Sequence, residues 1–227
     1  MSLHSQAAGI GSLADDTRRA LYEYVVSQGE PVGREQAAGA LGIAQHNVNF
    51  HLDRLVDEGL LAVEFRRLTG RTGPGAGRPS KLYRRSDREF SVTLPPRRYD
   101  LVGDILAAAV TRASAGEPLD TALDEVARSE GLVLGGAGRE LGDPGTADGL
   151  ARVLETQGYE PKVRDGVIEL DNCPFDSLAR KHTALVCALN KSFVQGVADG
   201  LGCHGITACL EPDPGRCCVK ARPTADQ

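Results

Sequence analysis

The stretch between residues 34 and 58 constrains the fold most, because two helix-forming segments follow each other through a very short turn. Residues 34–41 are rich in alanine, and Gly42 with Ile43 separates them from a second segment at 44–58. Apolar side chains recur in the second segment at the spacing of one helix face: Val48, Leu52, Leu55 and Val56. Residues 17–28 predict a helix before this pair. Two helices joined so tightly indicate a helix-turn-helix unit.

A glycine-rich basic segment follows the helical unit. Residues 60–67 and 80–85 predict two strands, and residues 69–79 between them contain four glycines and two prolines. Residues 66–88 carry eight basic side chains and a single acidic one, Asp87. Together these features predict a basic β-hairpin, or wing, suited to meeting phosphate.

These elements predict a double-stranded DNA operator as the partner. In a helix-turn-helix the second helix lies in the major groove, with its N-terminal residues against the base edges. The candidate base contacts are Gln45, His46, Asn47, Asn49 and Phe50. On the wing, Arg71, Arg78 and Lys81 are the candidates for contact with backbone phosphate or a minor groove.

Paired prolines at Pro95 and Pro96 divide the chain. We expect a DNA-binding domain at 1–89, a linker at 90–98 and a second domain at 99–227. The first 98 residues carry 14 Lys/Arg and 11 Asp/Glu, whereas the remainder carries 12 and 20, so only the first part is basic.

The sequence of the second domain predicts a fold of mixed helices and strands. Helical periodicity covers residues 99–113, 119–131, 147–157 and 174–201, and two hairpins are expected, one turning at Asp165 and Gly166 and one near residues 212–215. The fold class is therefore mainly α with small sheets (α+β). The abundance of small residues on the helices favours close packing, including packing between the two subunits of a homodimer.

All six cysteines lie in the last quarter of the chain, at positions 173, 187, 203, 209, 217 and 218. A metal or iron-sulfur site, a redox pair and small buried side chains remain open as explanations. A helix N-terminus favours thiolate at Cys173. Cys217 and Cys218 are expected on the last strand, where alternation points Cys217 inward and leaves Cys218 on the solvent side, dispensable for a ligand set. Cys203 or Cys209 would complete that set.

Two parts of the sequence resemble one family of regulators. The run Leu-Gly-Ile-Ala-Gln-His-Asn-Val-Asn-Phe-His-Leu-Asp-Arg-Leu-Val-Asp-Glu-Gly-Leu-Leu at 41–61, followed by Gly-Arg-Pro-Ser-Lys-Leu-Tyr at 77–83, resembles ArsR-like and DeoR-like winged-helix regulators, in particular those similar to the SufR repressor of iron-sulfur assembly genes. Asn-Cys-Pro-Phe at 172–175, Val-Cys at 186–187 and a cysteine after Pro-Gly resemble the sensing domain of the same family. Asn49 departs from the family, whose members often carry a basic residue there.

The resemblance implies a repressor whose operator affinity depends on an iron-sulfur cluster. Four widely spaced cysteines hold the cluster in that family, and the matching positions here are Cys173, Cys187, Cys203 and Cys217. The alternatives are a zinc site or a metal-free thiol switch in the same DNA-binding protein. Structural zinc sites usually include a close cysteine pair, which this set of four lacks.

Other function classes lack support in the sequence. No apolar run is long enough to span a membrane, and the first residues lack a secretory signal, so a cytoplasmic protein is expected. Phosphate-loop, zinc-protease and nucleophile-elbow motifs are absent, and we do not expect an enzyme. The remaining enzymatic alternative is a thiol oxidoreductase that uses Cys217 and Cys218.

Overall fold

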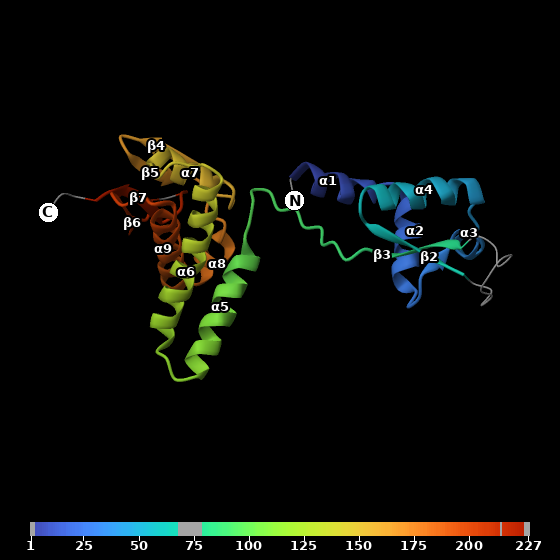
Figure 1. The fold of residues 1–227 in the computed structure, drawn as a ribbon, viewed down its shortest axis with the longest axis horizontal. Coiled ribbons are helices and arrows are strands. Elements are labelled where there is room, and N and C mark those ends of the chain that lie inside the picture. The colour runs from blue at the N-terminus through green and yellow to red at the C-terminus, as the bar shows by residue number, and fades with distance from the viewer. Residues whose placement is uncertain (1–2, 68–78, 214, 225–227) are drawn as a thin grey trace. The chain divides into compact units, whose positions relative to one another are not determined.

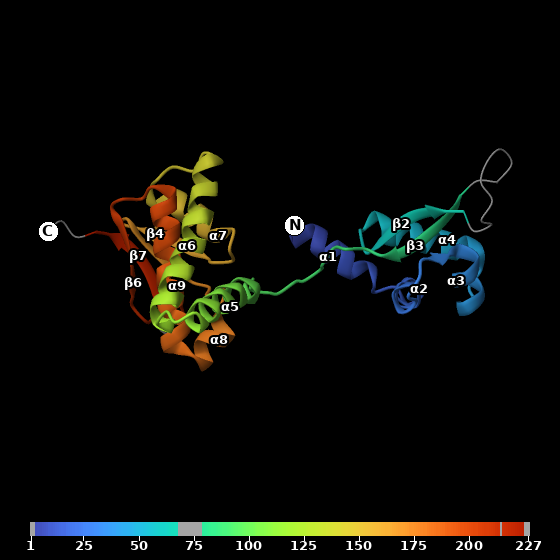
Figure 2. The same cartoon turned by 60° about the horizontal axis from the view of Figure 1, so that its bottom comes forward.

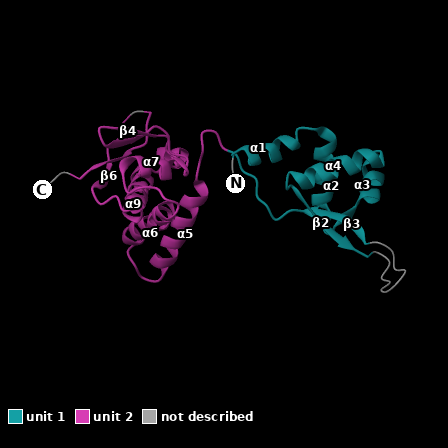
Figure 3. Cartoon of the chain, turned by 45° about the horizontal axis from the view of Figure 1, so that its top comes forward, with its two compact units in different colours: residues 1–92 teal, residues 93–227 magenta. Residues whose placement is uncertain are grey.

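The computed structural model describes residues 3–67, 79–213 and 215–224. The chain divides into two compact units, residues 1–92 and 93–227 (Figure 3). The division lies within the linker predicted at 90–98. Each unit has its own hydrophobic core.

Unit 1 combines four helices with a small antiparallel sheet in its described residues. Its elements are α1 (Leu3–Ser12), α2 (Asp16–Ser27), β1 (Val32–Gly33), α3 (Arg34–Leu41), α4 (Gln45–Asp57), β2 (Leu61–Arg66) and β3 (Ser80–Arg85). The strand order is β1-β3-β2. The predicted helices and the paired strands of the wing are confirmed, whereas α1 was not predicted.

Local sequence explains where the helices of unit 1 begin and end. The carboxylate of Asp15 accepts a hydrogen bond from the backbone N–H of Arg18 at 2.8 Å and so caps the start of α2. Gly42 ends α3 in the left-handed conformation, at φ 65°, which glycine adopts at little cost. The apolar face of α4 is fully buried at Val48, Leu52 and Leu55. This burial fixes which side of α4 remains available to a partner.

Unit 2 packs helices against one face of a four-stranded antiparallel sheet (Figure 1). Its elements are α5 (Tyr99–Ser114), α6 (Leu119–Glu140), α7 (Ala147–Glu155), β4 (Pro161–Arg164), β5 (Val167–Leu170), α8 (Asp176–Lys181), α9 (Thr183–Leu201), β6 (Ile206–Leu210) and β7 (Val219–Pro223). The strand order is β4-β5-β7-β6. The predicted α+β arrangement is confirmed, including the turn at Asp165 and Gly166, both of which have positive φ.

Helices α6 and α9 run side by side and form the central packing of unit 2 (Figure 2). Glycines allow the two backbones to approach closely. A Cβ atom placed at Gly135 would lie 2.2 Å from the carbonyl oxygen of Val197, and one at Gly196 would lie 2.1 Å from that of Arg128. Any side chain at these positions would therefore force the helices apart.

Two predicted helix boundaries in unit 2 differ from the structure. The helix expected at 174–201 is interrupted at His182, where φ is −134° and ψ is 51°, and this interruption separates α8 from α9. The helix expected to end at Gly131 continues to Glu140, because the glycines beyond that point pack against α9. Among the described residues, no helix combines the length and the apolar character needed to cross a membrane.

Candidate nucleic-acid interface and thiol cluster

The N-terminal end of α4 presents polar side chains to solvent. Gln45, His46 and Asn47 are exposed in the first turn, as the sequence predicted for residues that contact base edges. One turn later Phe50 is 66% exposed, and its ring packs edge-on against that of His51 at 5.3 Å between centroids. Asn49 is half-buried and contributes less surface. An exposed aromatic ring on this face is suited to an apolar contact such as a thymine methyl group.

The wing candidates fall partly outside the described structure. Arg71 and Arg78 lie outside the described residues. Lys81 lies on β3, where its Nζ atom is 2.7 Å from Oδ1 of Asp53 on α4. The predicted phosphate contact of Lys81 stays a prediction, but in the DNA-free protein this cation already has an anionic partner.

Asp53 is the centre of a polar cluster that joins α3, α4 and β3. Nη2 of Arg34 donates to both carboxylate oxygens of Asp53 at 2.9 Å, and the hydroxyl of Tyr83 donates to Oδ1 at 2.8 Å. The same hydroxyl accepts a hydrogen bond from Nε of Arg34 at 2.7 Å. We call Arg34, Asp53, Lys81 and Tyr83 the Asp53 cluster. Sequence reasoning missed it, because its members are brought together by strand pairing and helix packing.

The charges of the Asp53 cluster stabilise one another. Burial alone would raise the pKa of Asp53, but hydrogen bonds from Lys81 and Tyr83 and the charge of Arg34 hold it below the ordinary value. Burial alone would lower the pKa of Lys81, but its bond to Asp53 raises it. Burial raises the pKa of Tyr83, so its hydroxyl keeps its proton. The cluster therefore contains two cations and one anion at neutral pH.

Two of the predicted ligand cysteines meet in unit 2. Cys173 precedes α8 and is half-buried, whereas Cys217, just before β7, is 2% exposed. A hydrogen bond from the thiol of Cys173, followed by bonds from backbone N–H groups and Asn190, lowers the pKa of Cys217 despite its burial. Donating that bond, together with burial, raises the pKa of Cys173. The two sulfurs therefore lie within hydrogen-bonding reach, with the thiol of Cys173 as donor and the sulfur of Cys217 as acceptor. The expectation that Cys173 carries a thiolate at a helix N-terminus is therefore wrong, because α8 begins only at Asp176 and the hydrogen bond to Cys217 keeps the proton on Cys173.

The third predicted ligand, Cys187, is paired with a cysteine that the sequence had placed on the solvent side. Cys187 in the first turns of α9 forms a disulfide with Cys218, and their Cα atoms are 6.4 Å apart. The expectation that Cys218 points to solvent, away from the other sulfurs, is wrong. Strand alternation does not apply to it, because β7 begins only at Val219. We call Cys173, Cys187, Cys217 and Cys218 the thiol cluster.

Cys203, the fourth predicted ligand, lies apart from the thiol cluster. It follows α9 directly, and the length of that helix separates it from Cys187 by about 20 Å at 1.5 Å per residue. Its sulfur contacts the carbonyl oxygen of Thr146 at 3.6 Å instead. Cys209 on β6 is also occupied locally, 3.5 Å from a carboxylate oxygen of Glu211. The structure therefore does not bring Cys203 to the other three predicted ligands.

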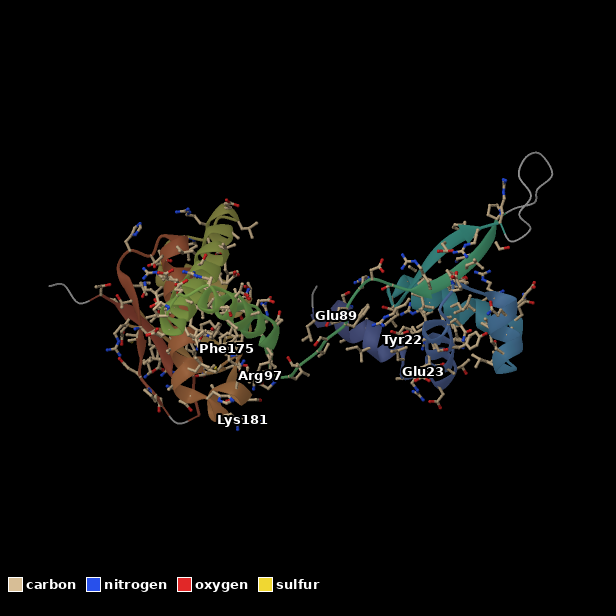
Figure 4. All side chains as sticks on the ribbon, turned by 90° about the horizontal axis from the view of Figure 1, so that it is seen from below. Tyr22, Glu23, Glu89, Arg97, Phe175 and Lys181 are labelled. Atoms are coloured by element: carbon tan, nitrogen blue, oxygen red, sulfur yellow. A yellow bond between two sulfur atoms is a disulfide. The ribbon has the colours of Figure 1, made fainter. Side chains whose placement is uncertain are left out.

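Polar side chains form hydrogen bonds with the thiol cluster at Cys217 and at Cys173. Nδ2 of Asn190 donates to the sulfur of Cys217 at 3.2 Å, and the buried hydroxyl of Tyr159 donates to the amide oxygen of Asn190. Arg97, labelled with Phe175 in Figure 4, donates to the carbonyl oxygen of Cys173 at 2.9 Å. The bond from Asn190 orients the sulfur of Cys217, whereas the bond from Arg97 holds the backbone at Cys173.

One side of the thiol cluster is accessible. A cavity of about 480 Å³ opens beside Cys173, and its walls include Arg97, Asp176 and Arg216. In the described part of the chain, no group of three or more His, Cys, Asp or Glu side chains is already arranged to hold a metal ion. With Cys187 and Cys218 oxidised, the thiol cluster offers two free thiols.

One comparison with known proteins supports the interpretation of unit 1. Residues 13–64 match the family model described as a helix-turn-helix domain, a match that covers α2, α3, α4 and the beginning of β2. No curated protein and no solved structure gives a significant match to the chain. The matched segment and the exposed end of α4 indicate a DNA-binding transcription regulator of the winged-helix type.

Proposed function

We propose that this protein is a transcriptional repressor whose operator affinity is set by the chemical state of the thiol cluster. The observation that carries the proposal is the convergence of four cysteines from three separate segments of unit 2, in a chain whose other unit contains a helix-turn-helix domain. A purely structural role does not require two adjacent sulfur pairs at one place. Two such pairs can serve a site that responds to oxidation or to a metal.

An iron-sulfur cluster is the cofactor we propose for the reduced form. The donor set suits it, because four thiols are the usual ligands and hydrogen bonds to sulfur, such as the one from Asn190, tune such centres. Cys187 and Cys218 can both bind iron only after their disulfide is reduced. Cys173, Cys187, Cys217 and Cys218 would hold the group, with Cys218 in the place that the sequence assigned to Cys203. When bound, the group supplies a redox-sensitive metal centre.

A metal-free thiol switch is the second candidate, and the disulfide favours it. Cys187 is on α9 and Cys218 leads into β7, so making or breaking their bond changes the link between a central helix and the sheet. A local change of this kind can alter the conformation of a whole protein. Binding of zinc by the same thiols is the third candidate.

We also propose that the regulator acts as a homodimer. Several apolar side chains of α5 and α6 and the residue that follows α6 remain exposed: Val110, Leu119, Leu132, Val133 and Leu141. A second subunit can cover exposed apolar side chains such as these, and two-fold operators match dimeric regulators. Sedimentation of the purified protein tests this: a monomer at all concentrations would contradict it.

Anaerobic purification followed by metal and sulfide analysis tests the cofactor. Iron and labile sulfide in the wild type, lost in Cys218→Ser and retained in Cys209→Ser, would support an iron-sulfur site in the thiol cluster. The Cys209 variant is the matched control, because it removes one half-buried cysteine of unit 2 outside the cluster. Zinc without iron would favour the zinc site. Protein that contains neither metal would contradict both metal proposals. Turnover of a disulfide substrate would favour a thiol oxidoreductase instead.

A further inference from the structure

The Asp53 cluster has the geometry of an anion-binding site. Three donors converge on one carboxylate: the guanidinium of Arg34, the ammonium of Lys81 and the hydroxyl of Tyr83. Arginine forks and lysine ammonium groups bind phosphate oxygens in the same way as they bind carboxylates. The anion that occupies the site in the DNA-free protein is the side chain of Asp53, which comes from the recognition helix α4.

The site lies on the face of unit 1 that carries the candidate base contacts. Phe50 lies four residues after His46, and Asp53 lies three residues after Phe50, so all three share one side of α4. Its side chain is 45% exposed, and those of Arg34 and Lys81 are about 30% exposed. A phosphate oxygen can therefore approach both cations from solvent without a rearrangement of the core.

A cavity of about 440 Å³ lies beside these cations. Arg34 and Gln36 from α3, Gln45 from the start of α4, and Ser80 and Lys81 from β3 contribute to its walls. Glu35 also lines it, but its side chain is exposed on α3. The cavity thus joins the first turn of the recognition helix to the wing strand, with hydrogen-bond donors along both sides.

We propose that Arg34 and Lys81 form a binding site for a DNA backbone phosphate, and that Asp53 occupies this site as an internal competitor in the free protein. This inference rests on the proposed DNA-binding function. On contact with a duplex, the phosphate takes over hydrogen bonds that Asp53 accepts in the free state. Asp53 thereby lowers affinity for every duplex alike, which leaves discrimination to the base contacts of α4.

Charge neutralisation at Asp53 tests the competition directly. Asp53→Asn removes the charge but keeps an oxygen that can accept from Lys81 or Tyr83. For a labelled duplex of scrambled sequence, we expect binding at least about threefold tighter and a dependence of log K on log[KCl] steeper by up to about one unit. Asp57→Asn is the matched control: it makes the same charge change one turn along α4, at an exposed residue. A gain of equal size in Asp57→Asn would show a bulk charge effect and overturn the proposal.

Substitutions of the two cations provide an independent test of the proposal. Arg34→Gln and Lys81→Gln in the otherwise unchanged protein should each weaken binding to the scrambled duplex and flatten its salt dependence. Combining both with Asp53→Asn should abolish the gain of the single Asp53 variant. Retention of that gain would overturn the proposal, as would unchanged salt dependence in the cation variants. Thermal unfolding of each variant identifies loss of the fold. Absence of DNA binding in the wild type would refute the proposed function itself, which is a separate result.

Discussion

The close approach of α6 to α9 makes Gly135→Ala a sensitive test of the fold of unit 2. The added methyl would lie 2.2 Å from the carbonyl oxygen of Val197 and 2.7 Å from the backbone nitrogen of Leu201. Both obstacles are backbone atoms, so no side-chain rotation relieves the overlap. An ordinary van der Waals separation requires α9 to move away by about 1 Å.

The expected loss of stability follows from two opposing effects. Overpacking of this kind costs about 3 kcal/mol when the obstacle is rigid. Replacing a helical glycine by alanine contributes about 1 kcal/mol in the opposite direction. The net destabilisation is therefore about 2 kcal/mol, or roughly 7 °C in the melting temperature for a unit of this size.

The neighbouring residue supplies the control. A Cβ atom at Gly136 would meet nothing within 4 Å. Gly136→Ala should therefore stabilise unit 2 by about 0.5–1 kcal/mol through helix propensity alone. Scanning calorimetry of the full chain measures both variants. If Gly135→Ala melts at or above the wild-type temperature, the two helices are not packed backbone to backbone and the reasoning fails.

Four further predictions concern the interface and the thiol cluster. Changing Asn49 or Phe50 to alanine should alter sequence preference more than affinity for scrambled DNA, and a uniform loss of affinity across sequences would count against base contact. Arg71→Ala, Arg78→Ala and Lys81→Ala together should instead flatten the salt dependence of binding by roughly one unit for each phosphate that is no longer neutralised. Cys203→Ser should leave the reactivity of Cys173 toward an alkylating reagent unchanged, because position 203 lies beyond the far end of α9, about 20 Å from Cys187 of the thiol cluster. Cys217→Ser should change that reactivity. An equal response to both substitutions would place Cys203 in the site. Because the pKa of Asp53 is depressed in the folded state, its contribution to stability is present above the unfolded value near 3.8 and is lost as pH falls below it. Acid titration followed by circular dichroism should therefore show a smaller loss of stability in Asp53→Asn than in the wild type. Identical acid transitions would contradict this.

The helix-turn-helix could be predicted because short-range patterns determine it. The glycine at position 42 and the apolar spacing of Val48, Leu52 and Leu55 each act within a few residues. The exposed first turn of α4 follows from the same periodicity. The match of residues 13–64 to a helix-turn-helix family supports the interpretation independently.

The arrangement of the cysteines could be predicted only in part, because it depends on how distant segments pack. The sequence indicated that Cys217 is buried and that Cys173 precedes a helix. The strand expected over Cys218 is absent, because the chain is still in a bend there, and the disulfide with Cys187 was therefore missed. The position of Cys203 could have been excluded from helix length alone. The Asp53 cluster required the register of β3 against β1, which pairs Tyr83 with Val32 and which no local pattern specifies.

The most direct test of the account is the affinity of the protein for one operator duplex in the two states of the thiol cluster. The duplex is selected from a random pool with the full-length protein, and binding is then measured by fluorescence anisotropy under anaerobic conditions. One sample is reduced and loaded with iron and sulfide, and the other is stripped of metal and oxidised. The account predicts dissociation constants that differ by at least about fivefold, the scale of coupling between linked sites. Equal dissociation constants for the two samples would contradict it.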